Sequence, residues 1–262
     1  MVETWCCGMP VWQLGLLASL AAGLMSGVGA LPILFVRQVS RRTQDVMMGF
    51  GAGVMLAATS FSLIVPAIDA GGGGVRAALI VVAGMALGAV FLWLSDRYSP
   101  HEHFIKGPEG SDPHRLRRIW LFVIAITLHN FPEGLAVGVG FGGHDVGNGM
   151  SLAVGIGLQN LPEGLVVALA LLTERYSVRD ALLIATLTGL VEPIGGVIGA
   201  GVVSVAQPVL PWGLAFAAGA MLFVVSDEII PESHRMEHAK AATVGVMIGF
   251  LVMMFLDVTL GG

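Results

Sequence analysis

A repeated hexapeptide contains the residues of this sequence best suited to hold a metal ion. HNFPEG at residues 129–134 recurs with small changes as QNLPEG at residues 159–164. Imidazole suits zinc and other transition metals, while carboxylates and amides suit harder divalent ions. His129 and Glu133 are four residues apart and Asn130 and Glu133 are three apart, so on a helix all three share one face. The same spacing in the second copy predicts a matching set of ligands.

Both copies lie within apolar stretches that are long enough to cross a bilayer. A charged side chain at the centre of a bilayer costs about 2.5–3.5 kcal/mol on insertion scales, so two glutamates there call for a compensating cation. Each copy also contains a proline, which removes one backbone hydrogen bond and predicts a break in the helix. Membranes tolerate such breaks only where protein or a water-filled cavity satisfies the freed carbonyl. Together these features predict a cation site inside the membrane.

The composition predicts an integral membrane protein. Of the 262 residues, 55% are hydrophobic and 12% are charged, whereas soluble domains carry about 25% charged residues. We expect an all-α fold with a single transmembrane domain over residues 1–262, and the lipid bilayer rather than a nucleic acid as its macromolecular partner. Eight apolar segments approach the roughly 20 residues that one span needs: 13–36, 46–68, 77–95, 119–143, 150–172, 181–204, 212–231 and 241–260.

The basic residues predict how these eight spans are oriented. The links after spans 1, 3, 5 and 7 hold 12 of the 13 Lys and Arg residues, and Arg76 is the remaining one. Basic residues accumulate in cytosolic loops, which places these four links in the cytosol and both termini outside. The longest link, about residues 96–118, is expected to be a solvated loop without a fold of its own, although its polar side chains could also capture a metal: His101, Glu102, His103 and His114.

Three motifs are predicted to lie at the same depth in the membrane. In spans 4 and 5, the midpoint between the flanking polar residues falls inside the hexapeptide. In span 6 it falls at Glu192-Pro193, a third glutamate–proline pair. Because spans 4 and 5 run antiparallel, a near two-fold axis in the membrane plane could bring the two hexapeptides face to face, in the inverted-repeat arrangement that many transporters use. We therefore expect the ligands of all three spans to meet at the bilayer centre.

A second polar group follows in span 7, where Asp227 and Glu228 precede Pro231. At 1.5 Å per residue, Glu228 is expected about 10 Å from the centre, toward the cytosol. We interpret Asp227 and Glu228 as an exit station for ions that leave the central site, in preference to solvated interfacial residues. For His234 and His238, which lie beyond them, a solvated helix face is at least as good an explanation.

Other functions explain this pattern less well. Polar residues that only join helices account for one asparagine, but not for three glutamates at the bilayer centre. A metal-dependent hydrolase within the membrane remains as the alternative, since a bound metal can activate water. The sequence has neither an HExxH motif nor a third intramembrane histidine to support it, and we expect neither enzyme activity nor a prosthetic group. One histidine, three glutamates and several amides without a thiolate predict a permissive site that takes zinc first, then cadmium, iron(II) and manganese.

These motifs resemble those of the ZIP (Zrt/Irt-like protein) family of divalent-metal transporters, and in particular its bacterial GufA-like branch. The resemblance rests on HNFPEG in span 4, QNLPEG in span 5, Glu192-Pro193 in span 6 and DEIIPESH in span 7, and it covers all eight spans. It implies a multi-pass protein of the cell (inner or plasma) membrane that moves divalent metal ions toward the cytosol. It also implies a homodimer in which one group of helices slides against another.

The resemblance further implies a role for each residue of the central site, which in this family is often binuclear. A first ion would be held by His129, Glu133, Gln159 and Glu163. A second ion would be held by the same two glutamates together with Asn130, Asn160 and Glu192. Gln159 stands where the commonest family pattern has histidine, which predicts a broader range of metals. Asn160 stands in place of a carboxylate, which predicts a weaker second position.

Overall fold

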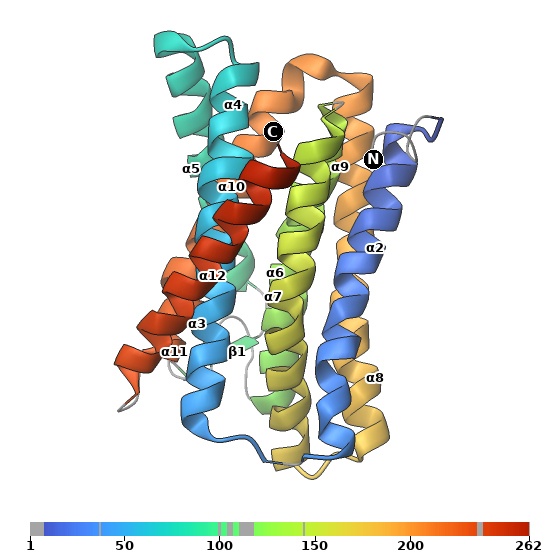
Figure 1. Cartoon of the computed structure of the whole chain (residues 1–262), viewed down its shortest axis with the longest axis vertical. Coiled ribbons are helices and arrows are strands. Elements are labelled where there is room, and N and C mark those ends of the chain that lie inside the picture. The colour runs from blue at the N-terminus through green and yellow to red at the C-terminus, as the bar shows by residue number, and fades with distance from the viewer. Residues whose placement is uncertain are drawn as a thin grey trace.

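The computed structural model describes residues 8–36, 38–98, 101–103, 107–109, 118–143, 145–234 and 238–261. Within these residues, eight helical segments are long and apolar enough to cross a membrane, which confirms the predicted eight-span, all-α fold. Several spans extend beyond the apolar runs that predicted them, because the helices continue into flanking polar residues. Span 2, for example, covers Arg41–Ala70. The first helix begins, and the last helix ends, at the same end of the bundle (Figure 1).

The helices follow one another up and down the bundle. The first half of the chain contains α2 (Val11–Ala30), a 3-10 turn η1 (Leu31–Leu34), α3 (Arg41–Ala57), a π-helical segment η2 (Ala58–Ile64), α4 (Val65–Ala70), α5 (Gly74–Tyr98) and α6 (Arg118–Gly142). The second half contains α7 (Val146–Thr173), α8 (Val178–Gly189), α9 (Glu192–Val205), a 3-10 turn η4 (Gln207–Val209), α10 (Leu210–Val224), a π-helical segment η5 (Val225–Ile229), α11 (Ile230–Ser233) and α12 (Ala239–Leu260). Span 2 consists of α3, η2 and α4, span 6 of α8 and α9, and span 7 of η4, α10, η5 and α11.

Side-chain caps help to set where three of these helices begin. Ser40 precedes α3, Asp145 precedes α7 and Ser177 precedes α8. Each accepts a hydrogen bond from the backbone N–H three residues further along. Such a cap satisfies one of the N–H groups that the start of a helix leaves without a partner, and it stabilises the helix by about 1 kcal/mol.

The prolines act differently from the sequence prediction. Span 6 does break at its proline, between α8 and α9. However, α6 and α7 continue as helices through Pro132 and Pro162, so the predicted breaks in spans 4 and 5 are wrong. In a membrane, neighbouring helices and small local adjustments can satisfy a single freed carbonyl without ending the helix. Two irregularities were not predicted: η2 and η5 each end two residues before a proline, Pro66 in span 2 and Pro231 in span 7.

The polar link between spans 3 and 4 contains a short hairpin. β1 (His101–His103) pairs antiparallel with β2 (Gly107–Glu109), and β1 lies against α6 (Figure 1). The sequence did not predict this pairing, which lies within a link expected to have no fold of its own. Pro108 does not prevent the pairing, because both strands of a two-stranded sheet are edge strands, where a missing N–H can be tolerated. His114 lies outside the described residues.

The helices pack in two groups. In the first, which we call the α2 group, α2 packs against α6, α7, α8 and α9, and α6 packs against α9. In the second, the α3 group, α3 packs against α12, α5 packs against α10, and α10 also contacts η2 and α4. The α3 group lies on the left of Figure 1 and the α2 group on the right. The two groups meet where α7 contacts α3 and α12, and where α6 contacts α10.

Close approach at glycines holds each group together. At seven of the described glycines, an added Cβ would fall within 2.0 Å of a backbone oxygen on another helix: Gly29, Gly53, Gly88, Gly134, Gly164, Gly219 and Gly249. All seven join helices of the same group; Gly53 on α3, for example, meets Val246 on α12. Small residues let helix backbones approach closely in a membrane, where van der Waals packing drives association. Where α7 meets α12, between the groups, Gly155 faces the flexible Met253 side chain, while Gly147 near the start of α7 approaches the backbone oxygen of Leu260.

Replacing Gly53 with alanine should lower the stability of the protein. The new Cβ would lie 2.0 Å from the carbonyl oxygen of Val246 and would force α3 and α12 apart, at a cost of about 1–3 kcal/mol. Gly201→Ala is the matched control, because no atom lies within 4 Å of its added Cβ. Thermal unfolding of the purified variants should show a lower Tm for Gly53→Ala and an unchanged or higher Tm for Gly201→Ala. Equal Tm values would contradict the prediction.

Candidate metal site

Three side chains of the first hexapeptide point into the protein from α6. His129, Asn130 and Glu133 are each at most 4% exposed, as expected for residues on one face of a helix. α7 packs beside α6 and buries Gln159 and Asn160. The Gln159 amide donates a hydrogen bond from Nε2 to Glu133 Oε1, with a length of 2.5 Å. The two hexapeptides therefore meet through the glutamate of the first copy and the first residue of the second.

Glu192 joins this centre from the break in span 6. It is the first residue of α9, and it is fully buried. Its carboxylate is favoured there because the N-terminus of a helix carries a partial positive charge. The Asn160 amide donates hydrogen bonds to Glu192 Oε1 (2.6 Å) and to the backbone carbonyl oxygen of Ala22 on α2 (2.9 Å). One asparagine thus connects α7, α9 and α2.

Glu228 reaches the same centre from the α3 group. Its Oε1 lies 3.0 Å from Nε2 of His129, so this pair joins η5 to α6. The sequence predicts Glu228 as part of a separate exit station, whereas in the structure its carboxylate contacts the central histidine directly. Asp227 precedes it in η5 and is half-buried. The two residues predicted on span 7 therefore lie next to the midplane set, at the contact between the two helix groups.

Glu163 lies among the other charged groups of the site. It interacts electrostatically with four neighbours: Glu133, Glu192, Glu228 and His129. Four carboxylates thus share this region with one imidazole, which supplies at most one positive charge. Repulsion between like charges is strong where water is excluded. A divalent cation would offset it.

Five buried oxygen atoms at this centre accept no hydrogen bond from the described residues: Asn130 Oδ1, Glu133 Oε2, Gln159 Oε1, Asn160 Oδ1 and Glu192 Oε2. A buried polar atom without a partner is unfavourable, and oxygen atoms gathered in this way suit a bound cation. In the described part of the chain, no three His, Cys, Asp or Glu side chains already surround such an ion. The amides of Gln159 and Asn160 occupy one oxygen each of Glu133 and Glu192 instead. If these amides turned, they would release the two carboxylate oxygens and offer their own oxygens to an ion.

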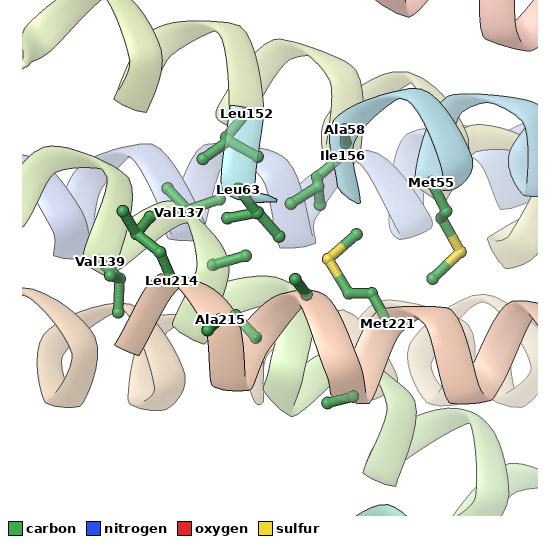
Figure 2. Close-up of a cluster of buried hydrophobic side chains, with 14 of the residues drawn as sticks. Met55, Ala58, Leu63, Val137, Val139, Leu152, Ile156, Leu214, Ala215 and Met221 are labelled. Carbon is green, nitrogen blue, oxygen red and sulfur yellow. The ribbon is translucent and has the colours of Figure 1, made fainter. Parts of the chain in front are cut away.

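Apolar side chains cover the site on the side where the chain begins and ends. Figure 2 shows this cluster, which includes Met55, Leu63 and Met221 from the α3 group and Val137 and Ile156 from the α2 group. α7 starts at that end of the bundle, and its Ile156 comes before the site residues in the sequence. α6 ends there, and its Val137 comes after the site residues. An ion that arrives from this end has to pass the cluster before it reaches the carboxylates.

Two features of the site were missed by the sequence analysis. The carbonyl of Ala22 carries no sequence signal, because every residue has a backbone carbonyl and only packing selects this one. The apolar cluster is equally hidden, because apolar residues occur throughout the spans. All three residues predicted on α6, and Gln159, Asn160 and Glu192, are nevertheless buried, and hydrogen bonds join Gln159 to Glu133 and Asn160 to Glu192.

Comparison with known proteins identifies the family. Residues 101–257 match the family described as ZIP Zinc transporter. The chain belongs to the ZIP family. The zinc transporter GufA of Myxococcus xanthus is 49% identical over 251 residues, which cover 94% of this chain and 99% of the relative. The zinc transporter ZIPB of Bordetella bronchiseptica is 47% identical over 247 residues, covering 92% and 80%, and human zinc transporter ZIP11 is 36% identical over 322 residues, covering 90% and 94%.

Replacing Gln159 with histidine should shift the metal preference of this ZIP protein toward zinc. The substitution removes the amide that bonds to Glu133 and supplies an imidazole, which favours zinc over harder ions. The ratio of zinc to manganese uptake into proteoliposomes should rise several-fold. Gln207→His is the control, because Gln207 bonds to the carbonyl of Gly142 near the end of α6, away from the centre. An unchanged ratio in Gln159→His, or an equal rise in the control, would show that residue 159 does not contact the ion.

Proposed function

We propose that this ZIP protein transports divalent transition-metal ions across the membrane toward the cytosol, with zinc as its first substrate and cadmium, iron(II) and manganese also accepted. The proposal rests on the five buried oxygens without hydrogen-bond partners, which lie beside four carboxylates and one imidazole. Such a mixed oxygen and nitrogen set suits zinc and its neighbours among the divalent metals. The three relatives described above are named zinc transporters, which supports the choice of metal.

The family resemblance implies transport toward the cytosol, and the orientation of the chain indicates which end of the bundle faces the cytosol. The links after spans 1, 3, 5 and 7 hold 12 of the 13 basic residues, so they belong in the cytosol and both termini belong outside. The apolar cluster of Figure 2 then separates the site from the outer side. Glu228 lies at the centre itself, in contact with His129, so it would take part in the release of the ion from the centre.

The site offers ligands for two adjacent ions. The first position is the group formed by His129, Gln159 and the two hexapeptide glutamates. The second position adds Asn130, Asn160 and Glu192, each of which has an oxygen atom that accepts no hydrogen bond from the described residues. Amide oxygens bind divalent ions more weakly than carboxylates because they carry no net charge. The second position therefore binds metal less tightly than the first.

Metal loading competes with a contact between the two helix groups. The Nε2 atom of His129 can face either the carboxylate of Glu228 or a metal ion, but not both, since it has one lone pair or one proton in that direction. An ion that takes this nitrogen therefore releases η5 from α6. Because the glycine contacts tie each group together internally, this release favours movement of one group against the other, as the family resemblance implies.

An inverted repeat accounts for the pattern of helix contacts. In this repeat, spans 1, 2, 3 and 4 correspond to spans 6, 7, 8 and 5, in that order. The contact of α2 with α7 (spans 1 and 5) then corresponds to that of α9 with α6 (spans 6 and 4). The contact of α3 with α12 (spans 2 and 8) corresponds to that of α10 with α5 (spans 7 and 3). The same exchange relates the two π-helical segments, η2 and η5, each of which ends two residues before a proline. A homodimer in the inner or plasma membrane is the assembly that the family resemblance implies.

A membrane-embedded hydrolase is the less favoured function. It would need a bound metal that stays in place to activate water, whereas a cargo site must also release its ion. The His129–Glu228 pair offers the ion a competitor for its nitrogen ligand, which suits release. In addition, none of the relatives described above is named as an enzyme.

Replacing Glu133 or Glu163 with alanine should abolish metal uptake. Each change removes a carboxylate from the centre of the site, where the charge interactions converge. Zinc uptake into metal-free proteoliposomes should fall to the level of protein-free liposomes, with unchanged amounts of inserted protein. Glu174→Ala, which removes an exposed carboxylate outside the spans, should transport normally. Full uptake by Glu163→Ala would exclude its carboxylate from the metal site.

Acidification should weaken metal binding at the central site. Metal binding requires a neutral imidazole and ionised carboxylates, so protons and metal compete for the same atoms. Because His129 and several glutamates titrate as one coupled group, more than one proton should be released per metal bound. Calorimetric titration in buffers of different ionisation enthalpy counts these protons, and His129→Gln should reduce the number. Metal binding without proton release between acidic and neutral pH would contradict this competition.

A further inference from the structure

A surface depression lies at the end of the bundle opposite the termini, away from the metal site. It has a volume of about 640 Å³ and is lined by six residues: Gln38, Leu172, Thr173, Tyr176, Ser177 and Val178. They come from the link between spans 1 and 2, the end of α7 and the start of α8. Gln38, Thr173 and Ser177 are exposed and the other three are half-buried, so the depression opens at the surface. Its volume is in the range of ligand-binding pockets.

Four arginines flank the lining residues in the sequence. Arg41 and Arg42 follow shortly after Gln38, and Arg175 and Arg179 enclose the lining residues 176–178. All four are exposed, and none forms an ion pair with another described residue. Two exposed acids lie close to Arg175 and Arg179 in the sequence: Glu174 at the end of α7 and Asp180 in the first turn of α8. Asp180 Oδ2 accepts a hydrogen bond from Ser177. An excess of positive charge remains around the depression.

Arg175 has a left-handed backbone conformation. Arg175 follows the end of α7 with a φ of 65°, and it is the one non-glycine residue with positive φ among those the structure describes. Its N–H bonds to Leu172 and the next N–H bonds to Leu171, which is the usual way to end a helix with a left-handed residue. Glycine is the favoured residue there, because a Cβ strains this conformation. This position holds arginine, although glycine is common in the chain, with 37 residues.

Aromatic and apolar residues place the depression at the level of lipid headgroups. The Trp120 indole donates a 2.8 Å hydrogen bond to the Tyr176 hydroxyl, and the two rings also make an edge contact. Tryptophan and tyrosine gather where the hydrocarbon meets the headgroups. Phe35, at the end of span 1, is 88% exposed just before the link that contains Gln38. The depression therefore lies where the membrane surface meets the protein.

We propose that this depression binds the phosphodiester headgroup of an anionic phospholipid in the cytosolic leaflet. Arginine binds phosphate with two parallel hydrogen bonds, and four arginines flank the lining residues in the sequence. Within the described residues, the amide of Gln38 and the hydroxyl hydrogen of Tyr176 are not used by other groups, so both remain available as donors. Basic pockets between spans on the cytosolic side are suited to anionic headgroups. The bound lipid would hold together the ends of spans 1, 5 and 6, all of which belong to the α2 group.

The test measures thermal unfolding of the full-length protein in a neutral detergent with added lipid. Phosphatidylglycerol and phosphatidylcholine with the same acyl chains are compared at increasing concentration. A ligand that binds the folded state raises the Tm as its concentration exceeds its Kd. Phosphatidylglycerol should raise the Tm by several degrees more than phosphatidylcholine, and native mass spectrometry should show it retained on the protein.

Arg175→Gly is the decisive variant. Glycine relieves the left-handed backbone, so the Tm without lipid should stay the same or rise, while the specific effect of phosphatidylglycerol should fall to less than half. Arg179→Gln, and Arg41→Gln combined with Arg42→Gln, should weaken the effect as well. Arg76→Gln is the matched control, because Arg76 is an exposed arginine at the opposite end of the bundle, and it should keep the full effect.

Three results would overturn the proposal. They are equal stabilisation by the two lipids, a full effect of phosphatidylglycerol in Arg175→Gly, and an equal loss of the effect in Arg76→Gln. The last result would assign the effect to general charge attraction. Inorganic phosphate and glycerol 3-phosphate serve as soluble probes; stabilisation by either to the same extent would identify a soluble phosphate as the ligand and exclude the lipid headgroup.

Discussion

Carboxylates placed far from water impose the main constraint on this protein. Hydrocarbon offers them no hydrogen bonds, so each oxygen needs a partner from the protein or a cation. The protein satisfies part of this need: amides of α7 donate to Glu133 and Glu192, the N-terminus of α9 favours Glu192, and His129 contacts Glu228. What it does not supply is enough positive charge, because one imidazole stands beside four carboxylates. A divalent cation bound at this centre, as we propose, would supply the missing charge.

The last glycine of each hexapeptide contributes to this site through the backbone. Gly134 packs against the carbonyl oxygen of Glu192, and Gly164 packs against that of Ser26 on α2. A side chain at either position would separate α6 from α9, or α7 from α2. Asn160 can reach both Glu192 and the backbone of α2 because these helices approach so closely. Each motif thus combines a candidate metal ligand with the glycine that brings the neighbouring helix within hydrogen-bonding distance.

The sequence predicts which residues lie at the bilayer centre, because depth follows from the position of a residue within its span. The eight spans are confirmed, and His129, Gln159 and Glu192 are all buried, while their depth in the bilayer stays a prediction. The partners of these side chains could not be predicted, because they depend on how spans far apart in the sequence pack. His129 was expected to share its ligand role with a residue one turn away on its own helix. In the structure it instead pairs with Glu228 of span 7.

Proline was a poor guide to where the backbone departs from a regular helix, and the departures matter for function. A π-helical turn contains an extra residue, so it rotates the side chains on one side of it relative to those on the other. In span 7 this turn carries Asp227 and Glu228 and brings Glu228 to α6; in span 2 it carries Ser62, whose hydroxyl donates to Asp257 of α12 (2.6 Å). Both turns belong to the α3 group, whereas the hexapeptides and Glu192 belong to the α2 group. Neither group alone contains the full set of charges, and the contact of Glu228 with His129 is where the charges of the two groups meet.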